Sequence, residues 1–240
     1  IDWRNLDDQN YIDPVKNQGA CASCVAFGSL AAVLARARIE QKIPVNASNG
    51  QTLVPFSEAQ LFYCIAERTG FNCKTGWNIR NALETLSIQG VVPAAKFPYT
   101  AGDQACKSEA SWDNETTVIK SYQVLRAVTA MKTELALHGP LIASLNIYPE
   151  FQHYTGGVFV PTKTGKSLGG HCVAVIGYND QDSYQAHGQS AKGYWICKNS
   201  WGADWGEKGF FRVAYGACGI SAGGAAVKGF SRLYKASVHV

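Results

Sequence analysis

The 240-residue sequence has little charge, no long apolar run and no internal repeat. Charged residues make up 17% of the chain, and the 22 basic residues are scattered singly among 18 acidic ones, which disfavours nucleic-acid binding. The longest mostly apolar run, residues 25–35, is followed by Arg36 and falls well short of the roughly 20 residues that span a bilayer. Apolar residues at 46% still suffice for a core, so global disorder is excluded.

A leader sequence is also missing from the start of the chain. The sequence opens with Ile1-Asp2-Trp3-Arg4, which contains neither a Met nor a basic and apolar leader, as expected of a processed or trimmed chain. Two glycosylation sequons begin at Asn46 and Asn114 and lean toward a secreted protein.

The hydrophobic pattern changes from helical in the first half to strand-like in the second. The pattern predicts helices over residues 24–40, 57–67, 78–88 and 131–138 and strands over 141–147, 157–160, 171–178, 193–198 and 209–214. Ser57 and Gln60 fit a capping box at the start of the second helix. We therefore expect an α+β fold of two packed lobes with a cleft between them, the usual place for an active site.

Cys24 stands where a glycine-containing loop runs into the first predicted helix. Ser23 is a natural N-cap, and the partial positive charge of a helix N-terminus favours thiolate over thiol. A nucleophilic thiol also needs a proton acceptor, and His171 opens a predicted strand within the roughly 130–150 residues downstream that are typical of such a pair. Asn199, at the end of another strand, supplies an amide oxygen that can hold the imidazole in one tautomer.

The pairing of predicted strands 171–178 and 193–198 can be checked against these roles of His171 and Asn199. If they pair antiparallel with His171 opposite Asn199, the two side chains share one face and Val173 lies opposite Cys197. The same register puts Cys172 and Cys197 on opposite faces, so both are predicted to be small buried hydrophobes rather than a disulfide.

The expected pair has an electrostatic consequence for the Cys24 thiol. A thiolate about 4 Å from an imidazolium gains about 4 kcal/mol at an effective dielectric constant near 20. This equals about 3 pK units, which predicts an ionised Cys24 at neutral pH. Gln18, on the loop before Cys24, is placed to bind an oxyanion with the Cys24 N–H, and Trp201 is placed to shield the Asn199–His171 hydrogen bond.

Other interpretations of these residues remain open. Cys21 and Cys24 form a Cys-x-x-Cys pair that fits a redox motif or half of a zinc site, although a second ligand pair at metal spacing is missing. His171 also fits a hydrogen-bonded core histidine. The remaining histidines are predicted to lie at the surface or at helix ends: His138, His153, His187 and His239.

The chain resembles the papain-family cysteine peptidases nearly from end to end. Nine blocks carry the resemblance in the family's order: 2–4 (DWR), 14–19 (PVKNQG), 21–24 (CASC), 57–61 (SEAQL), 97–99 (FPY), 151–159 (FQHYTGGVF), 170–178 (GHCVAVIGY), 198–202 (KNSWG) and 205–209 (WGEKG). Any one block arises by chance, but nine in order do not.

The resemblance implies a papain-like two-lobed fold and endopeptidase chemistry through a thioester. It implies a helical lobe at 1–110, an antiparallel β-barrel-like lobe at 111–240, and terminal arms that cross over. It assigns the catalytic roles to Cys24, His171, Asn199 and Gln18, and implies disulfides Cys21–Cys73 and Cys64–Cys106, with Cys218 left free. The substrate-binding residues that it implies are Gly76, Trp77, Asn78, Ser144, Gly169, Gly170, Trp201 and Gly223, around a roomy, uncharged pocket.

The resemblance also bears on partners and location. It implies peptide or protein substrates, a pro-segment, cystatin-like inhibitors, a monomer, and no metal or organic cofactor. It favours a secreted, lysosomal or vacuolar protein in an oxidising or acidic compartment. No insertion with paired histidines follows Cys106, which favours an endopeptidase over an exopeptidase.

Two residues depart from the family pattern beside the nucleophile. Val25 replaces the usual Trp and Gly28 replaces the usual Ser. These changes motivate an alternative hypothesis, a catalytically weak homologue that binds peptides or proteins.

Overall fold

The computed structural model describes residues 1–48, 50–102, 104–107, 110–162 and 165–234. Its helices are α1 (Cys24–Gln41), α2 (Ile79–Ile88), α3 (Val128–His138) and α4 (Pro149–Gln152). Its shorter helical turns are η1 (Gln60–Ala66), η2 (Glu67–Thr69), η3 (Ala110–Glu115) and η4 (Ala217–Ala222). Its strands are β1 (Val118–Ile119), β2 (Tyr122–Leu125), β3 (Leu141–Ile147), β4 (Val158–Phe159), β5 (Gly169–Ala186), β6 (Gln189–Lys198), β7 (Phe210–Ala214), β8 (Gly224–Val227) and β9 (Phe230–Arg232).

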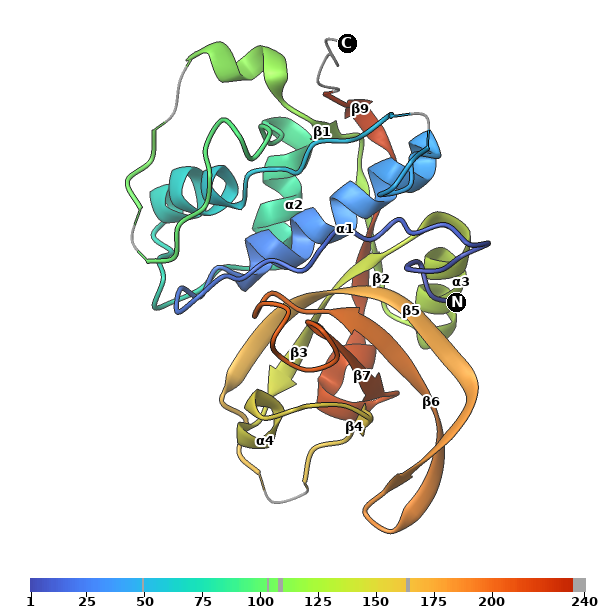
Figure 1. Cartoon of the computed structure of the whole chain (residues 1–240). Coiled ribbons are helices and arrows are strands. Elements are labelled where there is room, and N and C mark those ends of the chain that lie inside the picture. The colour runs from blue at the N-terminus through green and yellow to red at the C-terminus, as the bar shows by residue number, and fades with distance from the viewer. Residues whose placement is uncertain (49, 103, 108–109, 163–164, 235–240) are drawn as a thin grey trace.

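Helices and sheet are segregated in space, as Figure 1 shows, with α1 and α2 above and the long β5–β6 hairpin below. This arrangement confirms the predicted α+β class. The main sheet has seven strands in the order β2-β8-β3-β5-β6-β7-β4. In the described chain its edge strands β2 and β4 do not pair with each other, and β4 runs parallel to β7. The sheet is therefore open rather than a closed barrel, and its pairings are antiparallel except for β4 with β7.

Helix α1 forms where its apolar pattern predicts. Its side chains are buried along most of its length because it lies between the other helices and the sheet, and Lys42 ends it in a left-handed conformation at φ 55°. The predicted side-chain cap is absent, since the Ser23 hydroxyl hydrogen-bonds the Tyr99 hydroxyl at 2.8 Å and no helix N–H.

The second predicted helix forms with only half of its capping box. The Gln60 N–H donates to Ser57 Oγ at 3.0 Å. The Gln60 side chain, however, accepts from the Val92 N–H at 3.0 Å and does not reach back to Ser57. The segment continues as the π-helical η1 and the 3-10 turn η2.

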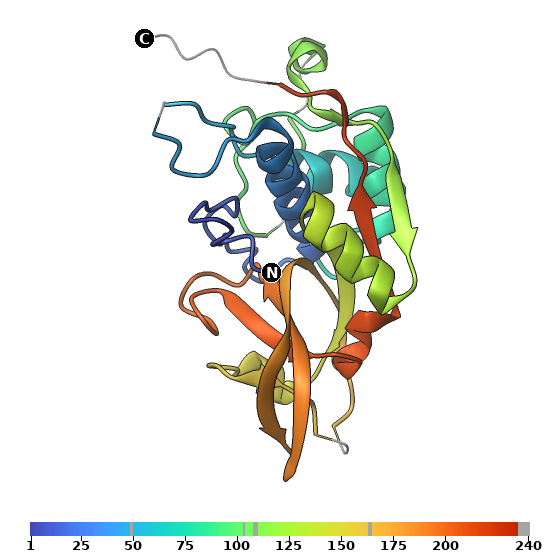
Figure 2. The same ribbon diagram turned by 90° about the vertical axis from the view of Figure 1, so that its right-hand side faces the viewer.

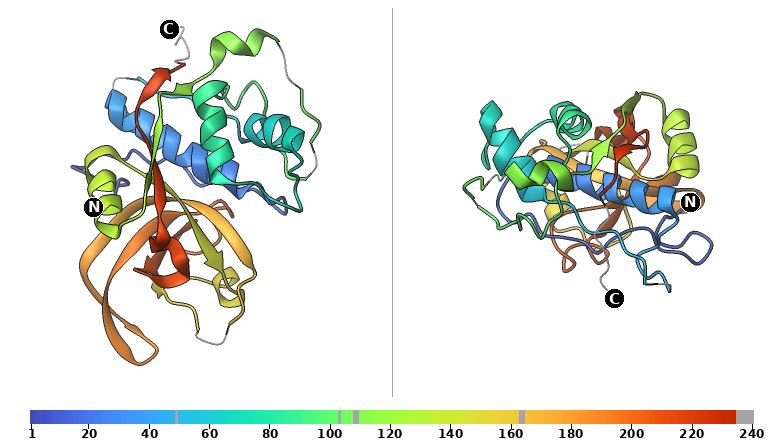
Figure 3. Two further views of the ribbon diagram at one scale, coloured as in Figure 1. Left: turned by 180° about the vertical axis from the view of Figure 1, so that it is seen from behind. Right: turned by 90° about the horizontal axis from the view of Figure 1, so that it is seen from above.

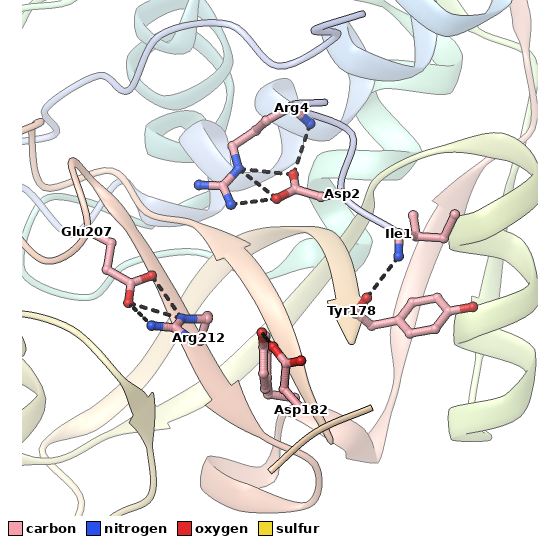
Figure 4. Close-up of polar contacts among 8 residues, drawn as sticks. Ile1, Asp2, Arg4, Tyr178, Asp182, Glu207 and Arg212 are labelled. Carbon is pink, nitrogen blue, oxygen red and sulfur yellow. Dashed lines mark hydrogen bonds and ion pairs between the residues drawn. The ribbon is translucent and has the colours of Figure 1, made fainter. Parts of the chain in front are cut away.

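Each end of the described chain lies against a segment that is far away in the sequence. The Ile1 ammonium donates to the Tyr178 carbonyl at 3.0 Å and the Tyr178 N–H donates to Ile1 O at 2.9 Å, which ties the N-terminus to β5 (Figure 4). Figure 2 shows this end beside β5 and α3. From behind, in Figure 3, β8 and β9 run from the sheet toward the helices, where β9 pairs with β1.

A buried ion pair fastens the N-terminal segment to α1. Arg38, 3% exposed, donates to both carboxylate oxygens of Asp13 at 2.7 Å and to the Leu53 carbonyl at 3.1 Å. None of the described helices is long and apolar enough to cross a membrane.

Removing the acid of this pair is expected to destabilise the fold strongly. Asp13→Ala leaves the buried Arg38 guanidinium without its counter-charge, which costs about 3–5 kcal/mol in free energy of unfolding. Urea denaturation checks this, with Glu84→Ala as the control because the Arg80–Glu84 pair is 80% and 50% exposed. A loss below about 1 kcal/mol for Asp13→Ala contradicts the expectation.

Candidate active site

The β5–β6 hairpin brings His171 and Asn199 together. His171 Nε2 lies 2.7 Å from Asn199 Oδ1, and the Ser200 N–H donates to the same oxygen at 2.8 Å. Because an amide oxygen only accepts, His171 Nε2 carries the proton and a neutral ring has its lone pair on Nδ1. Both side chains are buried, and the Trp201 ring lies over the imidazole with centroids 4.9 Å apart.

The pairing register differs from the predicted one by two residues. Val175, not Val173, lies opposite Cys197, and the register shifts between Val175 and Gly177. A slip of two keeps every side chain on its face, because side chains alternate along a strand. The prediction that His171 and Asn199 meet therefore survives an error in register.

A hydrogen-bonded network joins Gln18 to this pair. Gln18 Nε2 donates to the Cys21 carbonyl at 2.8 Å, and Ser200 Oγ donates to Gln18 Oε1 at 2.6 Å. One Nε2 hydrogen remains for another acceptor. Ser200 thus connects Gln18 to Asn199, a role that sequence reasoning missed although Ser200 lies next to Asn199 in the chain.

Cys24 begins α1 and is only partly buried. Two backbone N–H groups lower the pKa of its thiol: that of Cys172, the residue after His171 on β5, and that of Val25. Helix α1 and strand β5 therefore place the Cys24 thiol beside the backbone of Cys172, the residue that follows His171.

Burial works against ionisation of both groups. It raises the pKa of the Cys24 thiol, and the backbone N–H of Cys172 opposes the rise. It also lowers the pKa of His171 to about 4, although the hydrogen bond that His171 donates to Asn199 raises it. The structure thus favours a resting pair of thiol and neutral imidazole. Burial is the largest effect on both pKa values and opposes the predicted thiolate.

An apolar cavity of about 240 Å³ lies between α2 and the sheet. Ser144 and Gly223, both predicted pocket residues, line it. Other lining residues come from α2, β2, β3 and β8 and include Leu83, Tyr122, Val124, Ile142 and Ala143. Arg80 also lines the cavity, so the expected uncharged lining is not found. Sequence reasoning missed these, although the alternation of Tyr122 and Val124 on one strand signals a shared face.

The remaining predicted substrate residues lie outside the lining of this cavity. Asn78 caps α2 by accepting from the Asn81 N–H at 2.9 Å. Gly76 has φ +71° and lies beside Ala22, on the loop that leads to Cys24. Trp77 is partly buried and its indole N–H has no partner in the described structure. A Cβ at Gly170 would meet nothing within 4 Å, and Trp201 lies on His171.

The cysteines separate into bonded and free groups. Disulfides join Cys21 to Cys73 and Cys64 to Cys106, the two pairs that the resemblance implies. Because Cys21 is bonded to Cys73, a redox or zinc pair of Cys21 and Cys24 is not present. Cys172, Cys197 and Cys218 are free and buried, as predicted, and no group of three or more metal-binding side chains is found in the part of the chain described.

The other histidines lie away from this constellation. His138, His153 and His187 are exposed, and His239 falls outside the described residues.

A thiol at a helix N-terminus, an imidazole on a strand and an amide that orients it define a cysteine-nucleophile hydrolase site. The family model "Papain family cysteine protease" matches residues 1–227, and the chain belongs to that family.

Individual relatives agree with this assignment. Ananain from Ananas comosus is 36% identical over 227 residues, covering 92% of this chain and 59% of ananain. The structure of digestive procathepsin L 3 from Tenebrio molitor larval midgut superposes with a TM-score of 0.75 at 27% identity, covering 95% of this chain and 68% of that one. The bromelain protease of Ananas comosus, solved with the E64 inhibitor, gives a TM-score of 0.70 at 30% identity, covering 95% and 97% of the two chains.

Several of these relatives are longer than this chain. The chain spans 59% of ananain, 64% of the Caenorhabditis elegans cathepsin B-like cysteine proteinase 3 and 58% of fruit bromelain.

Proposed function

We propose that this chain is a thiol-dependent endopeptidase that hydrolyses peptide bonds through a thioester acyl-enzyme. The observation that carries the proposal is the buried His171–Asn199 hydrogen bond of 2.7 Å, which fixes the tautomer with a free lone pair on Nδ1. That lone pair is the base that a neutral thiol at the start of α1 requires.

The proposed reaction has two stages. Cys24 Sγ attacks the scissile carbonyl carbon while its proton passes to His171 Nδ1, and His171 then gives that proton to the departing amine. A water molecule next attacks the thioester with His171 again as base, which releases the acid and restores the thiol. Asn199 orients the imidazole and stabilises the imidazolium formed in each stage.

Gln18 and the start of α1 supply the proposed oxyanion site. The spare Nε2 hydrogen of Gln18 and the Cys24 N–H, which has no intrahelical partner at a helix N-terminus, are both donors. The bonds to Cys21 and Ser200 hold the Gln18 amide in place before substrate binds. Both donors are retained with Val25 and Gly28 in the sequence.

The pKa of the proposed base, His171, sets the pH below which peptide hydrolysis is lost. Because burial lowers the pKa of His171 to about 4, the imidazole stays unprotonated well below the ordinary value of 6.5. We expect kcat/KM to be half-maximal near pH 4 and to fall about tenfold per pH unit below it. A pH profile measured with an uncharged substrate checks this, and an acid limb near 6.5 contradicts the buried base.

The apolar cavity is the proposed S2 pocket, which admits bulky apolar or aromatic P2 side chains. Ser144→Phe fills part of it, so we expect kcat/KM for a P2-Phe dipeptidyl amide to fall roughly 10- to 200-fold. The P2-Ala substrate should be nearly unaffected, and this ratio is the measurement. Equal losses on both substrates contradict the assignment.

Other properties of the chain belong to the same proposal. Residues 1–110 and 111–240 are proposed as two lobes of one peptidase unit, made with a pro-segment, inhibited by cystatin-like proteins and acting as a monomer. The two disulfides support an oxidising or acidic location, secreted, lysosomal or vacuolar. The exposed sequon residues Asn46 and Asn114 are accessible to glycosylation.

Dye release from dipeptidyl amides tests the proposed function. Turnover that is lost on thiol alkylation supports a peptidase. Peptide binding without turnover contradicts it and favours the weak-homologue hypothesis.

A further inference from the structure

The thiol of Cys172 lies against α1 one turn beyond the proposed nucleophile. A Cβ built at Gly28 would stand 2.9 Å from Cys172 Sγ and 3.0 Å from the Val173 nitrogen. The contact to the sulfur is closer than real Cβ atoms show, so the sulfur occupies the space that a side chain at position 28 would need. Gly28 follows Cys24 by four residues, which puts both on one face of the helix.

A second contact places Cys172 beside Cys24 itself. The Cys172 N–H acts on the Cys24 sulfur, where it opposes the rise in the thiol pKa. Its backbone and its sulfur therefore both face the turn from Cys24 to Gly28. Residues four apart on a helix have Cβ atoms about 5–6 Å apart, so the Cys172 sulfur, which lies against Gly28, is about one turn of α1 away from the Cys24 side chain.

We infer that Cys172 is a resolving cysteine for Cys24, so that mild oxidation by a peroxide ends in a Cys24–Cys172 disulfide. In the first step Cys24 Sγ attacks a peroxide oxygen, the O–O bond breaks, and Cys24 becomes a sulfenic acid as the peroxide is reduced to water. In the second step Cys172 Sγ attacks Cys24 Sγ, the S–O bond breaks, and the Cys172 proton leaves with the hydroxyl as water. Two equivalents of an external thiol reverse the disulfide.

Burial makes this partnership selective. Cys172 is 2% exposed, so a dissolved oxidant reaches the partly exposed Cys24 first. Burial also raises the pKa of Cys172 well above its usual range, so its proton is lost to the departing hydroxyl as its sulfur attacks. Holding the two groups side by side offsets that weaker nucleophilicity. A disulfide needs Cβ atoms about 3.5–4.5 Å apart, and the missing Cβ at Gly28 leaves the Cys172 sulfur free to turn toward Cys24.

The other free thiols provide an internal comparison. Cys197 and Cys218 are buried, and the charge of Cys218 acts on Cys197 and raises its pKa further. Among the described groups, the charge of Cys24 raises the pKa of Cys172. It is not among the causes that raise the pKa of Cys197 or of Cys218.

The test is peptide mapping of the whole protein after graded hydrogen peroxide. In the wild type we expect a Cys24–Cys172 linked peptide, a mass lower by two hydrogens, and return of at least nine-tenths of the free Cys24 after dithiothreitol. In Cys172→Ala, and in Cys172→Ser as a second variant, Cys24 should advance to sulfinic acid, and the recoverable fraction should fall below one-tenth. Cys197→Ala should behave as wild type.

Two results would overturn the inference. One is sulfinic acid at Cys24 forming equally fast in wild type and in Cys172→Ala. The other is a linked peptide that joins Cys24 to a cysteine other than Cys172. The readout is mass and needs no peptidase activity, so failure here is distinguishable from failure of the proposed function.

Discussion

Replacing Cys24 by alanine is expected to abolish peptide hydrolysis, with kcat/KM falling roughly 10⁵- to 10⁶-fold. The proposed reaction forms its covalent intermediate at Cys24 Sγ, and the other free cysteines are buried. The residual rate reflects only binding and the Gln18 oxyanion donor. Dye release from a dipeptidyl amide measures the effect, at enzyme concentrations high enough to detect a 10⁶-fold loss.

The matched control is Cys197→Ala, which removes a buried thiol that has no role in the proposed reaction and should retain activity within a few-fold. Circular dichroism of both variants should match the wild type. If Cys24→Ala retains more than about one-hundredth of wild-type activity, Cys24 is not the nucleophile.

Replacing His171 by alanine is expected to cost nearly as much, because a neutral thiol has no other base. The pKa of the Cys24 thiol is raised by burial, so little thiolate forms without a proton acceptor. We expect a loss of roughly 10⁴- to 10⁶-fold in kcat/KM, measured with the same amide.

Two comparisons separate this role from general damage to the fold. His153→Ala removes an exposed histidine and should leave kcat/KM within a few-fold. The double variant Cys24→Ala/His171→Ala should be no worse than either single one, because residues that act as a unit are not additive. Additive losses would show that the two side chains act independently.

Sequence patterns predict well where local chemistry decides the structure. The helix from Cys24 to Gln41 follows from its apolar positions, and α2 falls within the predicted range 78–88. The third helix starts three residues earlier than its apolar pattern predicts, at Val128 rather than Met131. Its N-cap residue, Ala127, makes no side-chain cap bond, so no sequence signal marks where this helix begins.

The larger errors in the predicted strands arise where tertiary contacts decide the structure. The hairpin extends to Ala186 and Gln189 through polar residues with weak strand signals, and β8 is a glycine- and alanine-rich strand recruited by its neighbours. The irregularity between Val175 and Gly177 shifts the β5–β6 pairing by one residue and leaves no trace in the spacing of the sequence.

For the candidate active site, the sequence predicts the identity of the residues but not their environment. Residue types and order identify Cys24, His171, Asn199 and Gln18 as candidates, because each chemistry admits few side chains. The depth of burial that sets the thiol and imidazole pKa values, and the bridge through Ser200, depend on how the helix packs on the sheet. Neither is available before the chain is folded.

The most direct test of the central claim is stoichiometric labelling with a thiol-directed epoxide peptide, followed by mapping of the modified residue. The account predicts one label per chain, at Cys24, persisting well below pH 6.5 and lost in His171→Ala. Labelling at Cys172, Cys197 or Cys218, or labelling that appears only as ordinary thiols ionise near pH 8.5, would contradict it.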